Sequence, residues 1–327
     1  MHRYAWLCLV LALGLVACGP TNDEENVGDG GSQWHPDGYT GGGDGPIDQP
    51  PPDNCSEAAK LVYVVADNGH MLSFDPKTTP PTLTDLGLLN KCPTTSGEQP
   101  FSMGVDRDAI GWVLAAKSDS LLGTQTGSGL YRVELNNGLN CTKANMAMNQ
   151  QGEFNLFGMG FVTNSAGSTL DTLYIAGGDG PGSGVGSRLG TVNMTTFQIT
   201  AGNTLSGWPE LTGNRNAELW GFYPDASAPK IAKIDKLSGG ESSIMPLNSI
   251  AGEPRAWAFA FWGGDFWVFL QKALSDTETT VYQVSGGANG QPAGQIVHQW
   301  LTSQLLGGSA YSIVGAGVST CAPAVID

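Results

Sequence analysis

The sequence predicts an all-β protein built from many short strands, on three observations. Glycine accounts for 47 of the 327 residues, and Gly-Gly, Asn-Gly and Pro-rich breaks recur along the chain. Trp, Tyr and Phe are spread through it, whereas charged residues make up only 14%. No long segment has the sustained 3.6-residue hydrophobic period of an amphipathic helix. This combination is typical of short strands joined by tight turns.

Five similar units repeat along the chain. Each contains an apolar strand with an aromatic residue near its start, and successive aromatic residues are about 46–62 positions apart. These strands are VYVVA from Val62, GWVLA from Gly111, LYIAG from Leu173, LWGFY from Leu219 and FWVFL from Phe266. A second strand that ends in a polar residue follows each of them, at Asp75, Glu134, Asn193, Asp235 and Ser285, and a third, more variable strand comes next.

A further strand is expected before every aromatic strand except the first. These leading strands are FSMGV from Phe101, FGMGF from Phe157, WPELT from Trp208 and WAFAF from Trp257. Most of them are rich in small residues, and WPELT fits the pattern least well. The first unit has no leading strand, but the C-terminal segment VGAGV (314–318) has the same small-residue character. The last strand of the chain is therefore expected to complete the first unit.

Units of four strands repeated about every 50 residues resemble the blades of a β-propeller. The resemblance covers nearly all of residues 56–322, and we assign residues 55–327 to this domain. It implies five four-stranded blades, the first of which is closed by the C-terminal strand. Closing the ring in this way removes two exposed sheet edges. The alternative is a β-sandwich in which the alternation is a coincidence.

The N-terminus carries a short apolar segment that ends at a cysteine. Residues 4–16 are almost wholly apolar, but about 13 residues are too few to span a bilayer and instead match the apolar region of a signal peptide. Residues 15–18, LVAC, resemble the lipobox of bacterial lipoproteins. The resemblance implies that residues 1–17 are a signal peptide and that Cys18 carries acyl chains such as palmitate, which would anchor the protein to a membrane. An ordinary signal peptide with a chance cysteine is the alternative.

The segment after the lipobox indicates where the protein would reside and how it would be held. Gly19, rather than Asp, follows Cys18, and by resemblance to the sorting pattern of Gram-negative bacteria this implies the outer membrane. Residues 18–54 are rich in Gly, Pro, Asp and Asn and have almost no aliphatic side chains, so we expect a disordered tether. The whole chain has a formal net charge of −15, which argues against a nucleic-acid partner.

Four cysteines remain beyond the signal peptide and Cys18. An exported protein with Cys55, Cys92, Cys141 and Cys321 is expected to form two disulfides, for which three connectivities exist. The propeller resemblance places Cys55 and Cys321 at the two ends of the first blade, so it implies the pairs Cys55–Cys321 and Cys92–Cys141. Metal ligation is the alternative, although the chain has no C-x-x-C motif.

No catalytic motif is evident, so we do not favour an enzymatic function. His70 follows the turn DNG (67–69) and His298 lies in a late strand, where neither has the setting of a catalytic base. The resemblance leaves one enzymatic alternative, a calcium-dependent, lactonase-like hydrolase with its metal in the central channel. Its ligands here would be Glu210, Asp106 and Asn216. These supply few of the six to eight oxygen ligands of calcium, so we expect no metal or other cofactor.

The favoured function is that of a binding or interaction module with an unidentified protein or glycan ligand. Trp208, Trp257 and Trp262 are candidates for one mouth of the propeller, where amphipathic side chains would serve a binding surface, although they also fit inter-blade packing. The long loops at 117–129 and 177–188 are expected to project from a single face. A structural envelope component without a specific ligand is a further alternative.

Overall fold

The computed structural model describes residues 55–92, 97–119, 124–150, 153–178, 186–273, 275–288 and 290–325. The expected signal peptide, the lipidation site Cys18 and the expected tether all lie outside these residues. Among the described residues, no helix is long and apolar enough to cross a membrane. Within these residues the regular structure is almost entirely β, with three short helical turns: η1 (Glu57–Lys60), η2 (Asn248–Ile250) and α1 (Thr302–Leu305).

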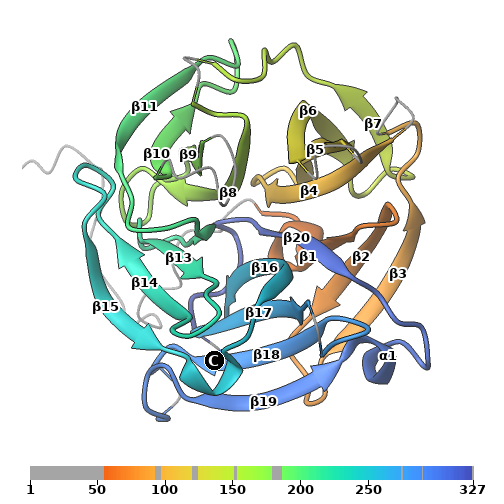
Figure 1. Cartoon of the computed structure of the whole chain (residues 1–327), viewed down its shortest axis with the longest axis vertical. Coiled ribbons are helices and arrows are strands. Elements are labelled where there is room, and N and C mark those ends of the chain that lie inside the picture. Colours follow the sequence, from red (N-terminus) through yellow and green to blue (C-terminus); the bar gives the residue numbers. More distant parts are fainter. Residues whose placement is uncertain are drawn as a thin grey trace, which may run out of the picture. The chain divides into compact units, whose positions relative to one another are not determined.

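Five four-stranded antiparallel sheets form a five-bladed β-propeller, as the repeat predicts (Figure 1). Written from the inner to the outer strand, blade 1 is β20 (Ile313–Val318), β1 (Val62–Ala66), β2 (His70–Asp75) and β3 (Thr82–Leu88). Blade 2 is β4 (Glu98–Val105), β5 (Ile110–Asp119), β6 (Thr124–Glu134) and β7 (Asn140–Lys143). Blade 3 is β8 (Leu156–Thr163), β9 (Asp171–Gly178), β10 (Arg188–Val192) and β11 (Ile199–Thr204).

The last two blades follow the same order. Blade 4 is β12 (Glu210–Gly213), β13 (Leu219–Tyr223), β14 (Lys230–Ile234) and β15 (Glu241–Pro246). Blade 5 is β16 (Pro254–Trp262), β17 (Asp265–Lys272), β18 (Thr280–Ser285) and β19 (Ile296–Leu301). The aromatic strands of the sequence repeat are the second strands of the blades, and the leading strands are the inner ones. The weak match WPELT contributes the shortest inner strand, β12, which begins only at Glu210.

The ring is closed by the first and last strands of the propeller. β20 pairs antiparallel with β1, with Val64 opposite Ala316 and Tyr63 opposite Gly317. In Figure 1 the blue β20 therefore lies beside the red-orange β1. The expected disulfide Cys55–Cys321 connects the segments that flank these two strands, and its Cα atoms are 5.9 Å apart.

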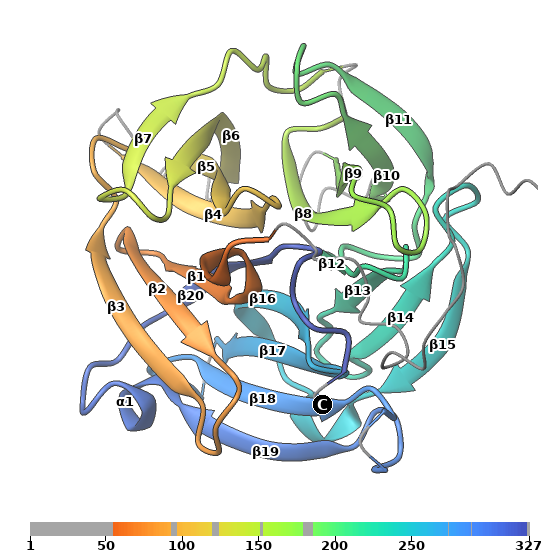
Figure 2. The ribbon, with the colours of Figure 1, turned by 180° about the vertical axis from the view of Figure 1, so that it is seen from behind.

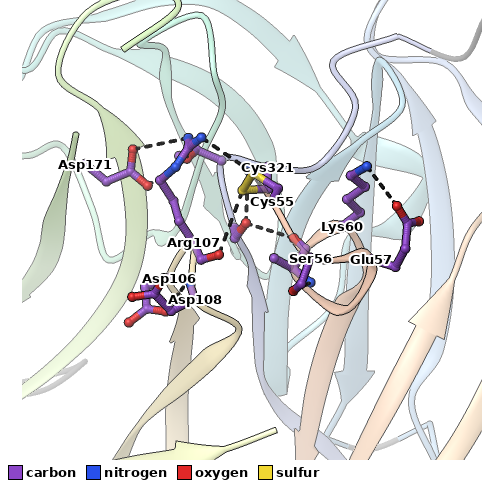
Figure 3. Close-up of a disulfide and its surroundings, with 12 residues drawn as sticks. Cys55, Ser56, Glu57, Lys60, Asp106, Arg107, Asp108, Asp171 and Cys321 are labelled. Carbon is purple, nitrogen blue, oxygen red and sulfur yellow. Dashed lines mark hydrogen bonds and ion pairs between the residues drawn. A yellow bond between two sulfur atoms is a disulfide. The ribbon is translucent and has the colours of Figure 1, made fainter. Parts of the chain in front are cut away.

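An arginine joins this closure to the neighbouring blades (Figure 3). Arg107, in the turn between β4 and β5, donates through Nη1 to Thr320 Oγ1 over 2.9 Å. Thr320 Oγ1 in turn donates to Asp171 Oδ2 of blade 3 over 2.7 Å. The guanidinium of Arg107 also lies 3.5 Å from Cys55 Sγ. Side chains from blades 1, 2 and 3 therefore meet around one disulfide.

The second expected disulfide, Cys92–Cys141, is also formed and connects blade 1 to blade 2. Cys92 follows the outer strand of blade 1, and Cys141 lies on β7, the outer strand of blade 2. Backbone hydrogen bonds reinforce the contact, since the Asn90 amide donates to the Leu139 carbonyl and the Cys141 amide to the Asn90 carbonyl. This disulfide therefore links two neighbouring blades at the outside of the ring and does not contribute to ring closure.

The inner strands surround the central axis and run parallel to one another, and small residues allow their close approach. On β20, Gly315 lies against Ser102 of β4. Two residues further along β20, Gly317 lies against Val105 of β4. A Cβ atom at Gly317 would lie 2.7 Å from Val105 Cγ2 and under 3 Å from backbone atoms of β4. Larger, mostly aromatic side chains fill the space between blades further out, as where Phe74 packs edge-on against Trp267 and Phe269.

Because the inner strands all run in the same direction along the axis, all five begin at the same end of it.

We predict that the two disulfides stabilise different parts of the ring. The Cys55–Cys321 loop spans 266 residues and the Cys92–Cys141 loop 49. In the chain-entropy model these correspond to upper limits of about 5–6 and about 4 kcal/mol. Replacing Cys55 and Cys321 with serine should therefore lower the free energy of urea unfolding more, and should accelerate amide hydrogen exchange in β20 and β1. The Cys92→Ser, Cys141→Ser pair is the matched control. Unchanged protection of β20 in the first variant would contradict the assignment.

Candidate functional site

A pocket of about 320 Å³ opens at the end of the axis where the inner strands begin. All five blades contribute to its wall, because each inner strand places its first residues there. The polar and charged residues in the wall are Asp67, Gln99, Gln125, Glu210, Arg255 and Ser312, and the aromatic ones are Phe101, Phe157, Trp208 and Trp257. This volume is at the lower end of the range of small-molecule sites, about 300–1,000 Å³.

The opposite end of the axis is covered by the two ends of the propeller domain. η1 and residues 319–324 lie across it, and in Figure 2 the red-orange coil of η1 is near the centre of the ring. Ser319 Oγ donates to the Ala59 carbonyl over 2.8 Å, and the Gly263 amide donates to the Pro323 carbonyl. The Nε1 atom of Trp262 donates to the Lys60 carbonyl over 2.7 Å. The pocket and the closing disulfide therefore lie at opposite ends of the ring.

Glu210 is the buried carboxyl group in the wall of the pocket. It is the first residue of β12 and only 3% of it is exposed. Ser102 Oγ of β4 donates to Glu210 Oε1 over 2.5 Å, and the Met159 amide of β8 lies 3.4 Å from the same atom. The glycine at 158 leaves room for this carboxyl, because a Cβ there would lie 2.8 Å from Glu210 Oε2. Three blades therefore meet at one carboxyl group.

Burial raises the pKa of Glu210 to about 8, and the hydrogen bonds from Ser102 and Met159 oppose this shift only in part. The carboxyl is therefore mostly protonated at neutral pH. A protonated carboxyl donates one hydrogen bond and still accepts others, whereas a carboxylate only accepts. Glu210 can thus contact a neutral polar ligand without adding a negative charge to the pocket.

The structure does not bring together the three residues of the calcium alternative. Glu210 is at the pocket, whereas Asp106 follows β4 and Asn216 follows β12, both at the far ends of inner strands. The Asp106 carboxylate accepts hydrogen bonds from the backbone amides of Asp108 and Ile110 and from Trp112 Nε1, and so builds the turn between β4 and β5. Among the described residues, no group of three or more His, Cys, Asp and Glu side chains is placed to hold a metal ion.

Of the three tryptophans for which both a place at one mouth and inter-blade packing were considered, two lie at the pocket and the third packs in the core. Trp208 and Trp257 line the pocket and are half-buried. Trp262 does not, because it ends β16 at the opposite end of the axis, where it is 2% exposed. The strand ends that flank the two long loops are on the pocket side, since β6 and β9 contribute Gln125 and Ala176 to the wall. Residues 120–123 and 179–185 of those loops are outside the described part of the chain.

The two histidines that the structure describes lie in blades 1 and 5. His70 Nδ1 lies 2.9 Å from Asp85 Oδ2, in a cluster with Tyr311 at the outer side of blade 1. His298 is on the outer strand β19, where its ring packs against that of Trp300. Neither His70 nor His298 lines the pocket.

Several residues of the pocket wall were not identified as candidates from the sequence. Gln99 and Arg255 precede the apolar cores of their inner strands, Asp67 follows β1, and Gln125 and Ser312 begin or precede strands. Each is an ordinary polar residue at a strand end. Their position in the repeat could have identified them. Once the blades are aligned, the residues just before each leading strand must surround one mouth of the channel.

Comparison with known proteins gives only distant structural likenesses. No family model matches the sequence, and no curated protein matches it. Among solved structures, the chain is similar to a luciferin-regenerating enzyme at 14% identity, covering 72% of this chain and 80% of that one with a TM-score of 0.39. It is similar to a calcium-binding protein, regucalcin, from Agrobacterium tumefaciens at 13% identity, covering 68% of each chain with a TM-score of 0.38. The β-propeller domain of Cps50 (Swd1) from Myceliophthora thermophila matches at 12% identity over 75% of this chain and 86% of that one, with a TM-score of 0.35.

We predict that Glu210 makes the stability of the fold pH-dependent. Its pKa is about 8 in the folded protein, against an ordinary value of 4.5. The stabilisation is therefore fully present below pH 4.5 and is lost as the pH rises through about 8, by up to about 5 kcal/mol. Glu210→Gln keeps the shape and an acceptor for Ser102 but does not titrate. Urea unfolding between about pH 6 and pH 9 should show a smaller loss of stability for the variant than for the wild type.

The matched control for this measurement is Glu57→Gln on η1, where the side chain is 81% exposed. It should keep the wild-type pH profile. Parallel profiles for wild type and Glu210→Gln would contradict a buried, neutral carboxyl at this position.

Proposed function

We propose that this chain is a lipid-anchored protein of the outer membrane of a Gram-negative bacterium, which presents its β-propeller as a ligand-binding module. The anchor rests on the LVAC sequence ending at Cys18 and on the Gly- and Pro-rich segment that follows it. Several acyl chains would hold the protein stably, since each buried CH₂ contributes about 0.8 kcal/mol. The binding role rests on the pocket.

The observation that carries the binding role is the composition of the pocket wall. Half-buried indole rings of Trp208 and Trp257 lie beside the polar side chains of Gln99, Gln125 and Arg255. Small-molecule sites typically combine aromatic walls with a few polar groups that fix the orientation of the ligand. All of these groups are carried by or adjoin strands of a closed ring, so the site is preformed.

A calcium-dependent, lactonase-like hydrolase remains the second candidate, because Glu210 is a buried carboxyl group at the central axis. Asp67 carries the other carboxyl group among the described residues of the pocket wall. Two carboxylates are well short of the six to eight oxygen ligands that calcium takes, so we place this function second.

The lipid anchor predicts specific labelling at one cysteine. When the full precursor is expressed in a Gram-negative host with labelled palmitate, the wild-type protein should incorporate label and sediment with the outer membrane. Cys18→Ser should abolish both. Cys8→Ser is the matched control, because Cys8 lies within the segment that would be removed, and it should label normally. Labelling of the Cys18→Ser protein would refute the assignment.

A thermal-unfolding screen separates the binding module from the hydrolase. The protein from residue 19 onward would be mixed with small sugars, amino acids, nucleosides and aromatic acids, and separately with calcium or EDTA. We expect at least one organic class to raise the Tm, and this shift should disappear in Trp257→Ala. A ligand at a hundred times its Kd stabilises by about 2.7 kcal/mol, which is several degrees for a domain of this size. A calcium-dependent rise that Glu210→Gln abolishes would instead favour the hydrolase, and no shift with any compound would argue against both.

A further inference from the structure

The charges around the pocket indicate that its ligand is uncharged. Asp67 and Arg255 contribute one negative and one positive charge to the wall, and the Glu210 carboxyl is mostly neutral at pH 7 because burial raises its pKa to about 8. Among the described residues of the wall, the pocket thus has no excess of either sign. An anionic ligand such as a phosphate ester would find a single arginine opposed by an aspartate, within a chain of formal net charge −15.

The aromatic groups offer flat apolar surfaces together with hydrogen-bond donors. The Trp208 ring edge packs over the backbone of β9, with Cη2 at 3.2 Å from the position of a Cβ on Gly178, so the ring is held in place. Trp257 is half-buried on β16. In the part of the chain that the structure describes, no acceptor pairs with either indole Nε1–H. Each ring therefore presents an apolar face and a free donor, the pair of features that a ligand with both C–H and hydroxyl surfaces would use.

The glutamines supply matched donors and acceptors. The Gln99 and Gln125 side chains are exposed in the wall of the pocket, and neither makes a side-chain hydrogen bond to another described residue. A carboxamide has two donors and one acceptor oxygen, whereas a hydroxyl both donates and accepts. Adjacent hydroxyls on a ring can therefore bond to a carboxamide in both directions. Below them, Glu210 and Ser102 form a second polar pair.

We propose that the pocket binds an uncharged mono- or disaccharide, or the end of a longer neutral glycan, with Trp208 and Trp257 against the C–H faces of the sugar and Gln99 and Gln125 on its hydroxyls. The inference rests on the proposed binding function and names its ligand class. The pocket volume of about 320 Å³ is suited to a ligand of this size. An apolar ligand would leave the free amide and indole donors unpaired, which is costly once they are desolvated.

The test measures sugar binding to the mature protein, from Cys18 onward, in a detergent that contains no sugar. Titration calorimetry and saturation-transfer NMR would use maltose, cellobiose and the disaccharide of N-acetylglucosamine as neutral probes, at concentrations up to tens of millimolar. Glucuronic acid and glucosamine would be the charged counterparts. We expect at least one neutral sugar to bind, with its ring C–H protons in contact with the protein, and the charged counterparts to bind more weakly.

Three variants locate the binding. Trp257→Ala should weaken it by about tenfold or more, in line with about 1.4 kcal/mol per decade of affinity. Gln125→Glu places a charge at an exposed position without disturbing the core, and it should also weaken binding, so the test stands even if the tryptophan variant unfolds. Trp300→Ala on the outer strand β19 is the matched control and should bind normally.

Each outcome bears on the proposal. Binding of a neutral sugar that is lost in Trp257→Ala or Gln125→Glu and kept in Trp300→Ala supports it. Preference for a charged sugar, or equal binding by all variants, overturns it. If no sugar binds but another compound class in the thermal screen requires Trp257, the saccharide assignment fails while the binding module stands. If no class binds, both fail.

Discussion

The pairing of β20 with β1 is the constraint on which the rest of the structure depends. Without β20, blade 1 would lack its inner strand, and both β4 and β16 would lose their neighbour around the axis. The glycines of β20 allow it to approach β4 closely enough for both strands to share the axis. Closure therefore sets the diameter of the ring, and the ring in turn sets the distances between the groups that face its centre.

Closure also makes the two ends of the axis chemically different. All inner strands begin at one end, so that end collects their first residues and forms the pocket. At the other end, η1 and the segment after β20 cover the axis and are held by hydrogen bonds such as that from Trp262 Nε1 to the Lys60 carbonyl. Glu210 illustrates the effect of this arrangement on chemistry. The Ser102–Glu210 contact joins blades 2 and 4, and the burial that this requires raises the pKa of the carboxyl.

The sequence was sufficient for the fold because the repeat is a local pattern. The five aromatic strands and their spacing identify the blades, and the small residues of the C-terminal segment identify it as the missing inner strand. The disulfide pairs followed from this placement. The site was predicted only in part: Trp208, Trp257 and Glu210 lie at the pocket, but Asp106, Asn216 and Trp262 lie at the other end. Which end of a strand faces the pocket depends on the direction of the inner strands, and neither composition nor spacing reveals at which end of the axis a pocket opens.

The position of Cys55 also determines how the domain would bear a mechanical load. Any force that reaches the propeller through the segment before Cys55 is divided at that residue. One part continues along the chain into η1 and β1, and the other crosses the disulfide to Cys321 and β20. The two strands of the closure are therefore loaded together and are not peeled from each other one hydrogen bond at a time. The same geometry places Cys55 and the mouth of the pocket at opposite ends of the ring, so a force applied at Cys55 would act on the face opposite the pocket.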